Sequence, residues 1–297
     1  MKASERRGPV ASVAPWIVAG LIVAGVVAFA SSRDARATLH CGPGLEPRTT
    51  RCCAPGQREE AGRCSGEPAS CPPPLERTAG GCVAKPARIS IAAGVLDRSA
   101  SDWEAVGAVA ARRITIDAFD IDAFEVTEAR WARCADAGAC ARLDLTGEPG
   151  LPITNVTADE AVRFCAFEGG SLPTPEQLAY AGAGPEGHRY PWGPTGAVCR
   201  RAAWGRARGP CARDAKGPEL AGVFPDGATP TGIHDLAGNV AEWSRSADGS
   251  IVEVRGGSFR DDAAASLRTW AYRTNVPDAR QDDVGFRCVY AAGSTRY

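Results

Sequence analysis

This sequence contains few histidines and methionines, and its net charge is close to zero. The 297 residues include three histidines and one methionine, and 34 basic side chains are balanced by 35 acidic ones. Because His40, His188 and His234 are far apart, a histidine-rich metalloenzyme or a three-histidine iron site is not expected. A net charge of −1 lacks the basic footprint of nucleic-acid binding, so we expect no nucleic-acid partner.

Glycine, proline and cysteine are abundant instead. The 34 glycines and 22 prolines predict a loop-rich fold. The twelve cysteines are even in number, and most of them lie in stretches rich in glycine and proline. Such cysteines are typically metal ligands in a cytosolic protein and disulfides in an exported one, so the N-terminus decides between these interpretations.

The N-terminus has the pattern of an export signal. Arg6 and Arg7 precede an uncharged stretch at residues 10–30, which ends in an A-x-A-like cleavage site. We expect residues 1–30 to be a signal peptide or, if they are not cleaved, a membrane anchor that tethers the chain through residues 10–30. Either outcome makes the rest of the chain extracytoplasmic, that is periplasmic, secreted or held at the outer face of the membrane.

Residues 31–85 are expected to form a cystine-rich segment, either a stalk or a small module. Six cysteines lie between Cys41 and Cys82, in a stretch with almost no aliphatic side chains. Such a stretch cannot build its own core, so cross-links must order it, and three disulfides are predicted. Their connectivity stays open, although the adjacent Cys52 and Cys53 should bond to different partners. Zinc is not expected, because paired C-x₂-C knuckles are missing.

The residues from 86 to 297 have the composition of an ordinary globular domain. Capped helices are predicted to begin after three threonines: Thr127, Thr157 and Thr174. Short strands are predicted in three alternating or apolar stretches: 113–119, 251–255 and 284–290. No internal repeat is apparent, and the chain beyond residue 190 is expected to consist mostly of loops.

Seven motifs follow one another in this domain. They are Phe124-Glu125-Val126-Thr127, Asn155-Val156-Thr157, Gly169-Gly170-Ser171-Leu172-Pro173-Thr174, Tyr190-Pro191-Trp192-Gly193, Gly238-Asn239-Val240-Ala241-Glu242-Trp243, Arg255-Gly256-Gly257-Ser258 and Gly285-Phe286-Arg287-Cys288. In this order they resemble the formylglycine-generating enzyme, or sulfatase-modifying factor, family. The resemblance implies an irregular, loop-rich α+β domain of the C-type-lectin-like type, placed after the cystine-rich segment.

The oxidase chemistry of that family depends on copper(I) held by two cysteines shortly after the Arg-Gly-Gly-Ser motif. The resemblance places Asp261 and Ser266 near those positions, and no cysteine occurs between Cys211 and Cys288. Copper(I) is a soft ion that needs thiolates, so a carboxylate and a hydroxyl are poor replacements. We therefore expect neither a copper site nor a catalytic residue of the family's reaction.

The cysteines of this domain are expected to form disulfides. Three bridges are expected: Cys165 with Cys288, Cys134 with Cys140, and Cys199 with Cys211. The first is implied by the resemblance, and the other two would close local loops. A further family bridge is missing at both ends, where Gly182 and the region of Ala271 replace the cysteines. The three bridges would leave no thiol free to act as a nucleophile.

One loop resembles a calcium loop of the same family. The implied ligands are the side chains of Asp235 and Glu242 and the backbone carbonyls of Gly238 and Val240. Hard oxygen donors suit Ca²⁺, which would stabilise a loop that lacks backbone ladders. The alternative is a metal-free turn stabilised by Asn239.

A candidate binding face carries tryptophan and arginine side chains. Its candidate residues are Ser258, Arg268, Trp270 and Arg273, and the same group includes Trp243 and Tyr272. The resemblance places this group near the substrate face of the family. Because most aromatic side chains only build a core, that alternative stays open for each of them.

The sequence thus predicts an exported bacterial protein that acts as a non-catalytic binding or structural module. Its partner would be an extracytoplasmic protein or a glycan. The alternative is an enzyme, either an oxidoreductase that converts sulfatase cysteines to formylglycine or another activity in the same cleft. The missing thiolate pair favours the binding module, because function depends on the atoms of the site rather than on the fold.

Overall fold

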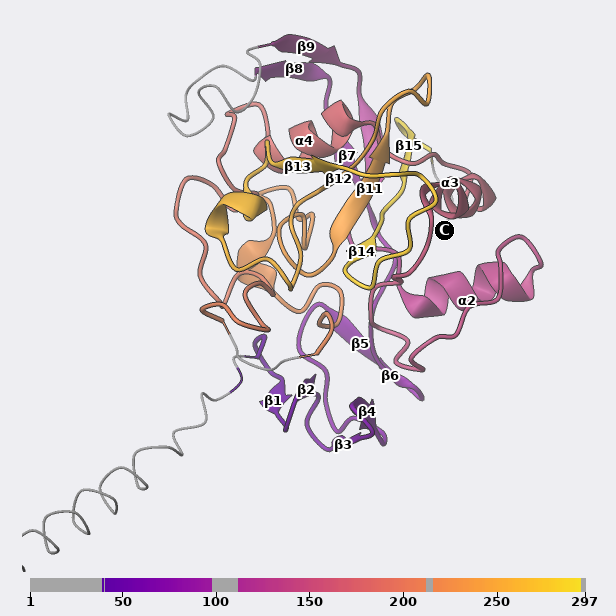
Figure 1. Ribbon diagram of the computed structural model, residues 1–297, viewed down its shortest axis with the longest axis vertical. Coiled ribbons are helices and arrows are strands. Elements are labelled where there is room, and N and C mark those ends of the chain that lie inside the picture. The colour runs from indigo at the N-terminus through magenta and orange to yellow at the C-terminus, as the bar shows by residue number, and fades with distance from the viewer. Residues whose placement is uncertain (1–38, 40, 98–111, 212–215, 295–297) are drawn as a thin grey trace, which may run out of the picture. The chain divides into compact units, whose positions relative to one another are not determined.

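A computed structural model describes residues 39, 41–97, 112–211 and 216–294. The predicted leader at residues 1–30, with its tether at residues 10–30, lies outside the described residues. Within the described ranges, no helix is long and apolar enough to cross a membrane. The cystine-rich segment and the domain that follows it fall in a single structural unit (Figure 1).

Three helices begin at the predicted threonines. They are α2 (Glu128–Asp136), α3 (Ala158–Phe167) and α4 (Pro175–Ala183). The side chain of Thr127 accepts a hydrogen bond from the N–H of Arg130, and the other two threonines form reciprocal capping boxes with Glu160 and Gln177. The predicted helix starts are confirmed, because each one depends on an interaction within a single turn.

The strands of the main domain form two small sheets and a hairpin. One sheet has the order β13-β12-β11-β14 and contains β11 (Ala241–Arg245), β12 (Val252–Arg255), β13 (Tyr272–Thr274) and β14 (Val284–Gly285). The other has the order β15-β10-β7 and contains β7 (Arg88–Ile91), β10 (Phe119–Asp122) and β15 (Val289–Ala291). The hairpin consists of β8 (Gly94–Asp97) and β9 (Arg113–Ile116). Only β11 and β14 pair in parallel; the other strand pairs are antiparallel.

The predicted strand at residues 251–255 is confirmed as β12, but the other two predictions are wrong in extent. Residues 113–119 are divided between β9 and β10, which belong to different sheets. Residues 284–290 are likewise divided between β14 and β15. Alternation identifies the exposed and buried faces of a strand, but it does not show where the chain changes partner.

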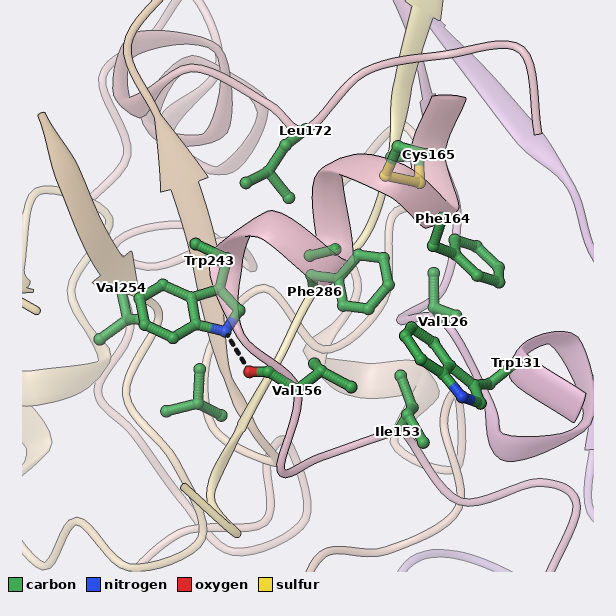
Figure 2. Close-up of a cluster of buried hydrophobic side chains, with 14 of the residues drawn as sticks. Val126, Trp131, Ile153, Val156, Phe164, Cys165, Leu172, Trp243, Val254 and Phe286 are labelled. Atoms are coloured by element: carbon green, nitrogen blue, oxygen red, sulfur yellow. Dashed lines mark hydrogen bonds between the residues drawn. A yellow bond between two sulfur atoms is a disulfide. The ribbon is translucent and has the colours of Figure 1, made fainter. Parts of the chain in front are cut away.

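The largest apolar core lies between α2, α3 and the four-stranded sheet (Figure 2). The indole of Trp131 stacks on Phe164 with ring centroids 5.7 Å apart, and Phe286 packs edge-on against Phe164 at 5.4 Å. Trp243 is fully buried here, and its Nε1 donates a hydrogen bond to the carbonyl of Val156 at 3.0 Å. Trp243 is therefore a core residue and not part of the candidate binding face.

The cystine-rich segment consists of three disulfide loops with one shared pattern. The bridges Cys41–Cys52, Cys53–Cys64 and Cys71–Cys82 each join cysteines with a sequence separation of 11. Each loop has a buried residue four positions after its first cysteine, namely Leu45, Gln57 and Leu75, and the N–H of that residue bonds to the carbonyl three positions earlier. The segment is therefore an internal repeat of three disulfide loops. The sequence alone did not reveal it, because the intervening residues differ from loop to loop.

Each disulfide loop carries a short antiparallel pair. The strands are β1 (Glu46–Pro47) with β2 (Cys52–Cys53), β3 (Arg58–Glu60) with β4 (Arg63–Ser65), and β5 (Leu75–Thr78) with β6 (Gly81–Ala84). The predicted three disulfides are present, and the adjacent cysteines have different partners, as expected.

The cystine-rich segment is packed against the main domain rather than extended as a free stalk. Leu45 and Leu75 share an apolar core with Phe124 and Phe259 of the domain. A buried ion pair joins Arg51 Nη1 to a carboxylate oxygen of Glu148 at 2.9 Å. Phe259 directly precedes the segment that carries Asp261 and Ser266, so this shared core anchors the start of that loop.

Candidate functional site

A cavity of about 560 Å³ opens beside β12, β13 and the loop that joins them. Its polar and aromatic lining includes Arg255, Asp261, Ser266, Trp270, Tyr272 and Arg273. A volume of this size falls in the range of ligand pockets, which are about 300–1,000 Å³. The two positions that the resemblance assigns to the copper thiolates, Asp261 and Ser266, therefore lie on the wall of one cavity.

Two adjacent glycines set the course of the chain into this cavity. Gly256 and Gly257 have φ values of 87° and 65°, which side-chain-bearing residues rarely adopt. A Cβ atom on Gly257 would lie 2.8 Å from the carbonyl oxygen of Ser266, and one on Gly256 would lie 2.7 Å from the carbonyl oxygen of Leu236. Only glycine fits here, and the turn brings the Ser266 segment back against the end of β12.

Asp261 is used as a cap within its own loop. One carboxylate oxygen accepts hydrogen bonds from the backbone N–H of Ser258 at 2.7 Å and lies 3.0 Å from the Ser258 hydroxyl. A carboxylate that accepts a backbone N–H three residues earlier stabilises a turn, as an Asx-type interaction does. Asp261, which the resemblance places at the first thiolate position, thus orders the loop through hydrogen bonds.

Ser258 lies beneath the cavity and not on its surface. Its side chain is fully buried, and its hydroxyl lies 3.0 Å from Asp283 as well as from Asp261. The guanidinium of Arg273 donates to the same oxygen of Asp283 at 3.1 Å. Through Ser258, Asp283 links Arg273 to the loop that Asp261 caps.

The candidate binding face is only partly assembled at the cavity. Trp270 and Arg273 line the wall, whereas Arg268 stacks on Trp270 with its guanidinium carbon 5.4 Å from the ring centroid and lines a smaller neighbouring pocket. Tyr272, also named in this group, is 49% exposed on the edge strand β13 and lines the cavity.

Arg255 is a lining residue that the sequence analysis did not single out. It is buried, pairs with Glu253 at 2.6 Å, and its guanidinium carbon lies 5.2 Å from the centroid of the Tyr272 ring. The sequence could have indicated this role, because Arg255 is the first residue of the Arg-Gly-Gly-Ser motif and ends a predicted strand. With Arg273, Trp270 and Tyr272 it gives the cavity wall guanidinium and aromatic groups, and each guanidinium is paired with a carboxylate, Arg255 with Glu253 and Arg273 with Asp283.

All twelve cysteines are bonded in six disulfides. The three bridges named for the domain, Cys165–Cys288, Cys134–Cys140 and Cys199–Cys211, are present in the structure. At the position of the missing family bridge, a Cβ atom on Gly182 would contact the side chain of Thr269 at 3.3 Å, two residues before Ala271. The two segments thus pack closely without a covalent link.

The candidate calcium loop lies in a buried acidic cluster. Asp235 and Glu242 are 4% and 2% exposed. Asp235 accepts a hydrogen bond from the N–H of Gly222 at 2.6 Å, and both oxygens of Glu242 accept from the guanidinium of Arg287. Asn239 donates to the buried carboxylate of Glu125 at 2.6 Å.

This cluster contains three buried carboxylates and one buried guanidinium, so it carries an excess of acid. Burial and the neighbouring Asp235 raise the pKa of Glu125 well above its usual range. Burial also raises the pKa of Asp235 to about 6 and raises the pKa of Glu242, against the opposing effect of Arg287. Burial disfavours the ionised form of these carboxyl groups. A bound cation or a proton would therefore neutralise them.

The donor set fits a calcium ion by its chemistry. Two carboxylates and two carbonyls are hard oxygen ligands, and a divalent cation would relieve the excess of negative charge. In the described part of the chain, no group of three or more His, Cys, Asp or Glu side chains is arranged around one metal position. The Asn239 side chain also accepts from the N–H of Glu219 at 2.8 Å, as a metal-free turn would require. Calcium at Asp235, Gly238, Val240 and Glu242 therefore stays a prediction.

Comparisons with known proteins agree with this architecture. Residues 77–292 match the sulfatase-modifying factor enzyme 1-like domain. A protein of Bos taurus named inactive C-alpha-formylglycine-generating enzyme 2 is 35% identical over 183 residues, which cover 57% of this chain and 58% of that protein. The formylglycine-generating enzyme of Streptomyces coelicolor is 29% identical over 231 residues, which cover 66% of this chain and 72% of that enzyme.

Solved structures share the fold at low sequence identity. PvdO from Pseudomonas aeruginosa superimposes with a TM-score of 0.54 at 19% identity, covering 69% of this chain and 94% of that one. Variable protein 1 of Treponema denticola superimposes with a TM-score of 0.51 at 18% identity, covering 74% of this chain and 100% of that one. The expected loop-rich α+β fold is thereby confirmed. Because the matched domain makes up most of the chain, this protein belongs to the family of the sulfatase-modifying factor enzyme 1-like domain.

Proposed function

We propose that this chain is an exported, non-catalytic binding module whose ligand occupies the cavity beside Asp261 and Ser266. One observation carries the proposal: both positions that the resemblance assigns to the copper thiolates hold hard oxygen donors, and all twelve cysteines are in disulfides. Copper(I) requires soft ligands, so the site lacks the atoms needed to bind it. The loop that would carry the thiolates is ordered instead by the Asp261 cap on Ser258.

Export is supported by the leader pattern and by the disulfides. Six disulfides in one chain of this size persist in an oxidising compartment and not in a reducing cytosol. The uncharged stretch at residues 10–30 with basic residues before it would direct the chain out of the cytoplasm, either cleaved or retained as a tether.

The cavity is suited to a protein or glycan ligand. Trp270 and Tyr272 offer flat apolar faces, and Arg255 and Arg273 offer guanidinium groups beside them. Aromatic and arginine side chains are the residues that contribute most to recognition surfaces. Calcium, if bound by Asp235 and Glu242, would fix the loop between residues 235 and 242 and would take no part in chemistry at the cavity.

The second candidate function is enzymatic, and it is supported by the names of several relatives. The chain is similar both to a protein named as inactive and to formylglycine-generating enzymes, and a stretch of 100 residues is 33% identical to hercynine oxygenase of Mycolicibacterium smegmatis. Two of these relatives carry the names of oxidising enzymes, which keeps an oxidase activity among the candidates for this chain. In this chain an oxidase would need a route that does not use the thiolate pair.

Two measurements test the proposal. The purified protein is incubated with a cysteine-containing sulfatase peptide, copper and a reductant, and the aldehyde is sought by mass spectrometry. We expect no product above a control without protein, and turnover would place the chain among the oxidases. Affinity capture from an extracytoplasmic fraction is then compared between the wild type and the Trp270→Ala and Arg273→Ala variants. The proposal predicts a partner that the wild type retains and both variants lose.

A further inference from the structure

A second groove lies on the main domain and shares no lining residue with the cavity beside Asp261. It has a volume of about 580 Å³ and is formed by the chain before β7, by α2, by the end of α3 and by β15. The side chains that matter for its chemistry are Lys85, Arg88, Arg130, Arg133, Phe167 and Glu168. We call it the Arg130 groove. Four of its lining side chains are cationic and two are acidic, so it carries net positive charge.

The floor of the Arg130 groove is buried and internally paired. Arg130 is 7% exposed, and its Nη1 donates to Asp122 at 2.9 Å, while the hydroxyl of Tyr290 donates to the other oxygen of Asp122 at 3.1 Å. The charge of Asp122 is thus neutralised from within. Among the described residues, Nε of Arg130 has no hydrogen-bond partner, which is an uncommon state for a buried donor.

The walls of the groove hold further arginine side chains in place. The guanidinium carbon of Arg88 lies 3.4 Å from the centroid of the Tyr290 ring, and its Nη2 lies 3.4 Å from the carbonyl oxygen of Glu168. The Glu168 carboxylate lies 3.4 Å from Arg130 and 3.7 Å from Arg133. Glu168 therefore contacts two guanidinium groups. With Asp122, two carboxylates face four cationic side chains in this groove.

The rim of the groove is exposed, cationic and partly apolar. Lys85 is exposed and has no ion pair within the described ranges, and the side chain of Arg133 is 64% exposed. Phe167, at the end of α3, is 43% exposed and lines the groove together with these cations. Cations and an aromatic ring from separate segments thus border one open groove.

We propose that the Arg130 groove binds an acidic, extended segment of a partner protein. Carboxylate side chains of that segment would pair with Lys85 and Arg133 at the rim, and an apolar side chain between them would pack on Phe167. Arginine and lysine at a rim give carboxylate recognition that is long-ranged and sensitive to salt. A protein segment is favoured over a small anion because Lys85 and Arg133 lie on separate segments and line the same groove as the partly exposed Phe167.

The test uses the mature protein and a fluorescein-labelled, glutamate-rich peptide with one central phenylalanine, followed by fluorescence anisotropy at low salt. The proposal expects saturable binding that weakens as ionic strength rises. The double variant Lys85→Glu/Arg133→Glu reverses both rim charges and should weaken binding roughly tenfold or more. The matched control is the double variant Arg63→Glu/Arg142→Glu, which reverses two exposed charges that do not line the groove. Phe167→Ala should also weaken binding, while Asp261→Ala should leave it unchanged.

Three results would overturn the proposal. The first is equal binding by the wild type and the rim double variant. The second is equal binding of a peptide in which glutamine replaces every glutamate. The third is preference for a sulfated glycan, heparin being the probe, over the acidic peptide at the same salt concentration. Because the Arg130 groove and the cavity beside Asp261 share no lining residue, the rim variants test this proposal alone, and the Trp270 and Arg273 variants test the proposed function.

Discussion

Arg287 and Glu242 form a buried ion pair at the centre of the domain. Nε of Arg287 lies 3.0 Å and 2.8 Å from the two carboxylate oxygens of Glu242, and Nη2 lies 2.6 Å from one of them. The same guanidinium donates to the backbone carbonyls of Asp122 and His234 at 3.1 Å and 2.7 Å. One side chain thus links β10, the candidate calcium loop and β11.

Removal of Arg287 should destabilise the domain strongly. Arg287→Met keeps much of the side-chain volume but leaves the carboxylate of Glu242 buried without its partner, which costs about 3–5 kcal/mol. The matched control is Arg260→Met, which breaks an exposed pair with Asp282 and should cost at most about 1 kcal/mol. Urea denaturation measures both. Equal losses in the two variants would contradict a central role for the buried pair.

Calcium should stabilise the protein if the candidate loop binds it. Asp235 and Glu242 belong to a cluster with excess acid, so a bound divalent cation would favour the folded state. A calcium level one hundred times the dissociation constant adds about 2.7 kcal/mol, which raises Tm. We expect EDTA to lower Tm, added Ca²⁺ to restore it, and Asp235→Asn to reduce the response. Identical melting curves with EDTA and with Ca²⁺ would favour the metal-free turn held by Asn239.

The capping box of α3 should make stability depend on pH at the acidic end. Burial tends to raise the pKa of Glu160, but hydrogen bonds from Arg280 and from the N–H of Thr157 outweigh it and lower the pKa. A lowered pKa means that the contribution of Glu160 is present above its unfolded pKa and is lost as pH falls through the folded value. Glu160→Gln should therefore cost about 1 kcal/mol at pH 7 and progressively less as the solution is acidified.

Asp159→Asn is the control for this experiment. Asp159 is the exposed neighbour on the same helix, and its side chain is 59% exposed beside Arg245. Its substitution should change stability by less than about 0.5 kcal/mol. If Glu160→Gln and the wild type differed by the same amount at pH 7 and at pH 3, the titration of Glu160 would not be the cause.

The sequence was informative where structure depends on neighbours along the chain. The three helix starts follow from threonine caps that bond within one turn, and the loop-rich character follows from glycine and proline. The family motifs also marked the Arg-Gly-Gly-Ser segment, where Gly256 and Gly257 form the turn into the cavity. These features needed no knowledge of distant contacts.

Features that depend on contacts between distant segments could not be predicted from the sequence. The stretch 113–119 alternates without interruption, yet β9 pairs with β8 while β10 pairs with β7 and β15. Ser258 belongs to the turn motif but is buried. Its hydroxyl contacts Asp261 of the same loop and Asp283, which is distant in the sequence. Neither the Arg130 groove nor the shared core of the cystine-rich segment has a local signature, since both arise only when separate segments pack together.

The bridge between Cys165 and Cys288 should be the most stabilising disulfide of the domain. It joins residues with a sequence separation of 123, whereas Cys134–Cys140 has a separation of 6. The chain-entropy model gives about 5 kcal/mol for the long loop and about 2 kcal/mol for the short one. The two double alanine variants, compared by denaturant unfolding, should differ in that order. A larger loss from the Cys134/Cys140 pair would contradict this ranking.

Restoring the missing thiolates should restore copper(I) binding. Asp261 and Ser266 line the same cavity, so Asp261→Cys/Ser266→Cys would place two soft ligands on one wall. The variant also loses the cap on Ser258, which should cost about 1 kcal/mol and leave the fold intact. Copper(I) affinity is measured by competition with a chromogenic copper(I) chelator, and the wild type should not compete.

The control for the restored pair is Asp262→Cys/Ser266→Cys. Asp262 is the exposed neighbour of Asp261 and does not line the cavity, so its thiolate should not share an ion with one at position 266. If both double variants bound copper(I) equally well, any two added thiols would suffice and the cavity would have no special role. If the wild type bound copper(I) as tightly as Asp261→Cys/Ser266→Cys, the oxygen donors would be adequate ligands, and the argument for a non-catalytic module would fail.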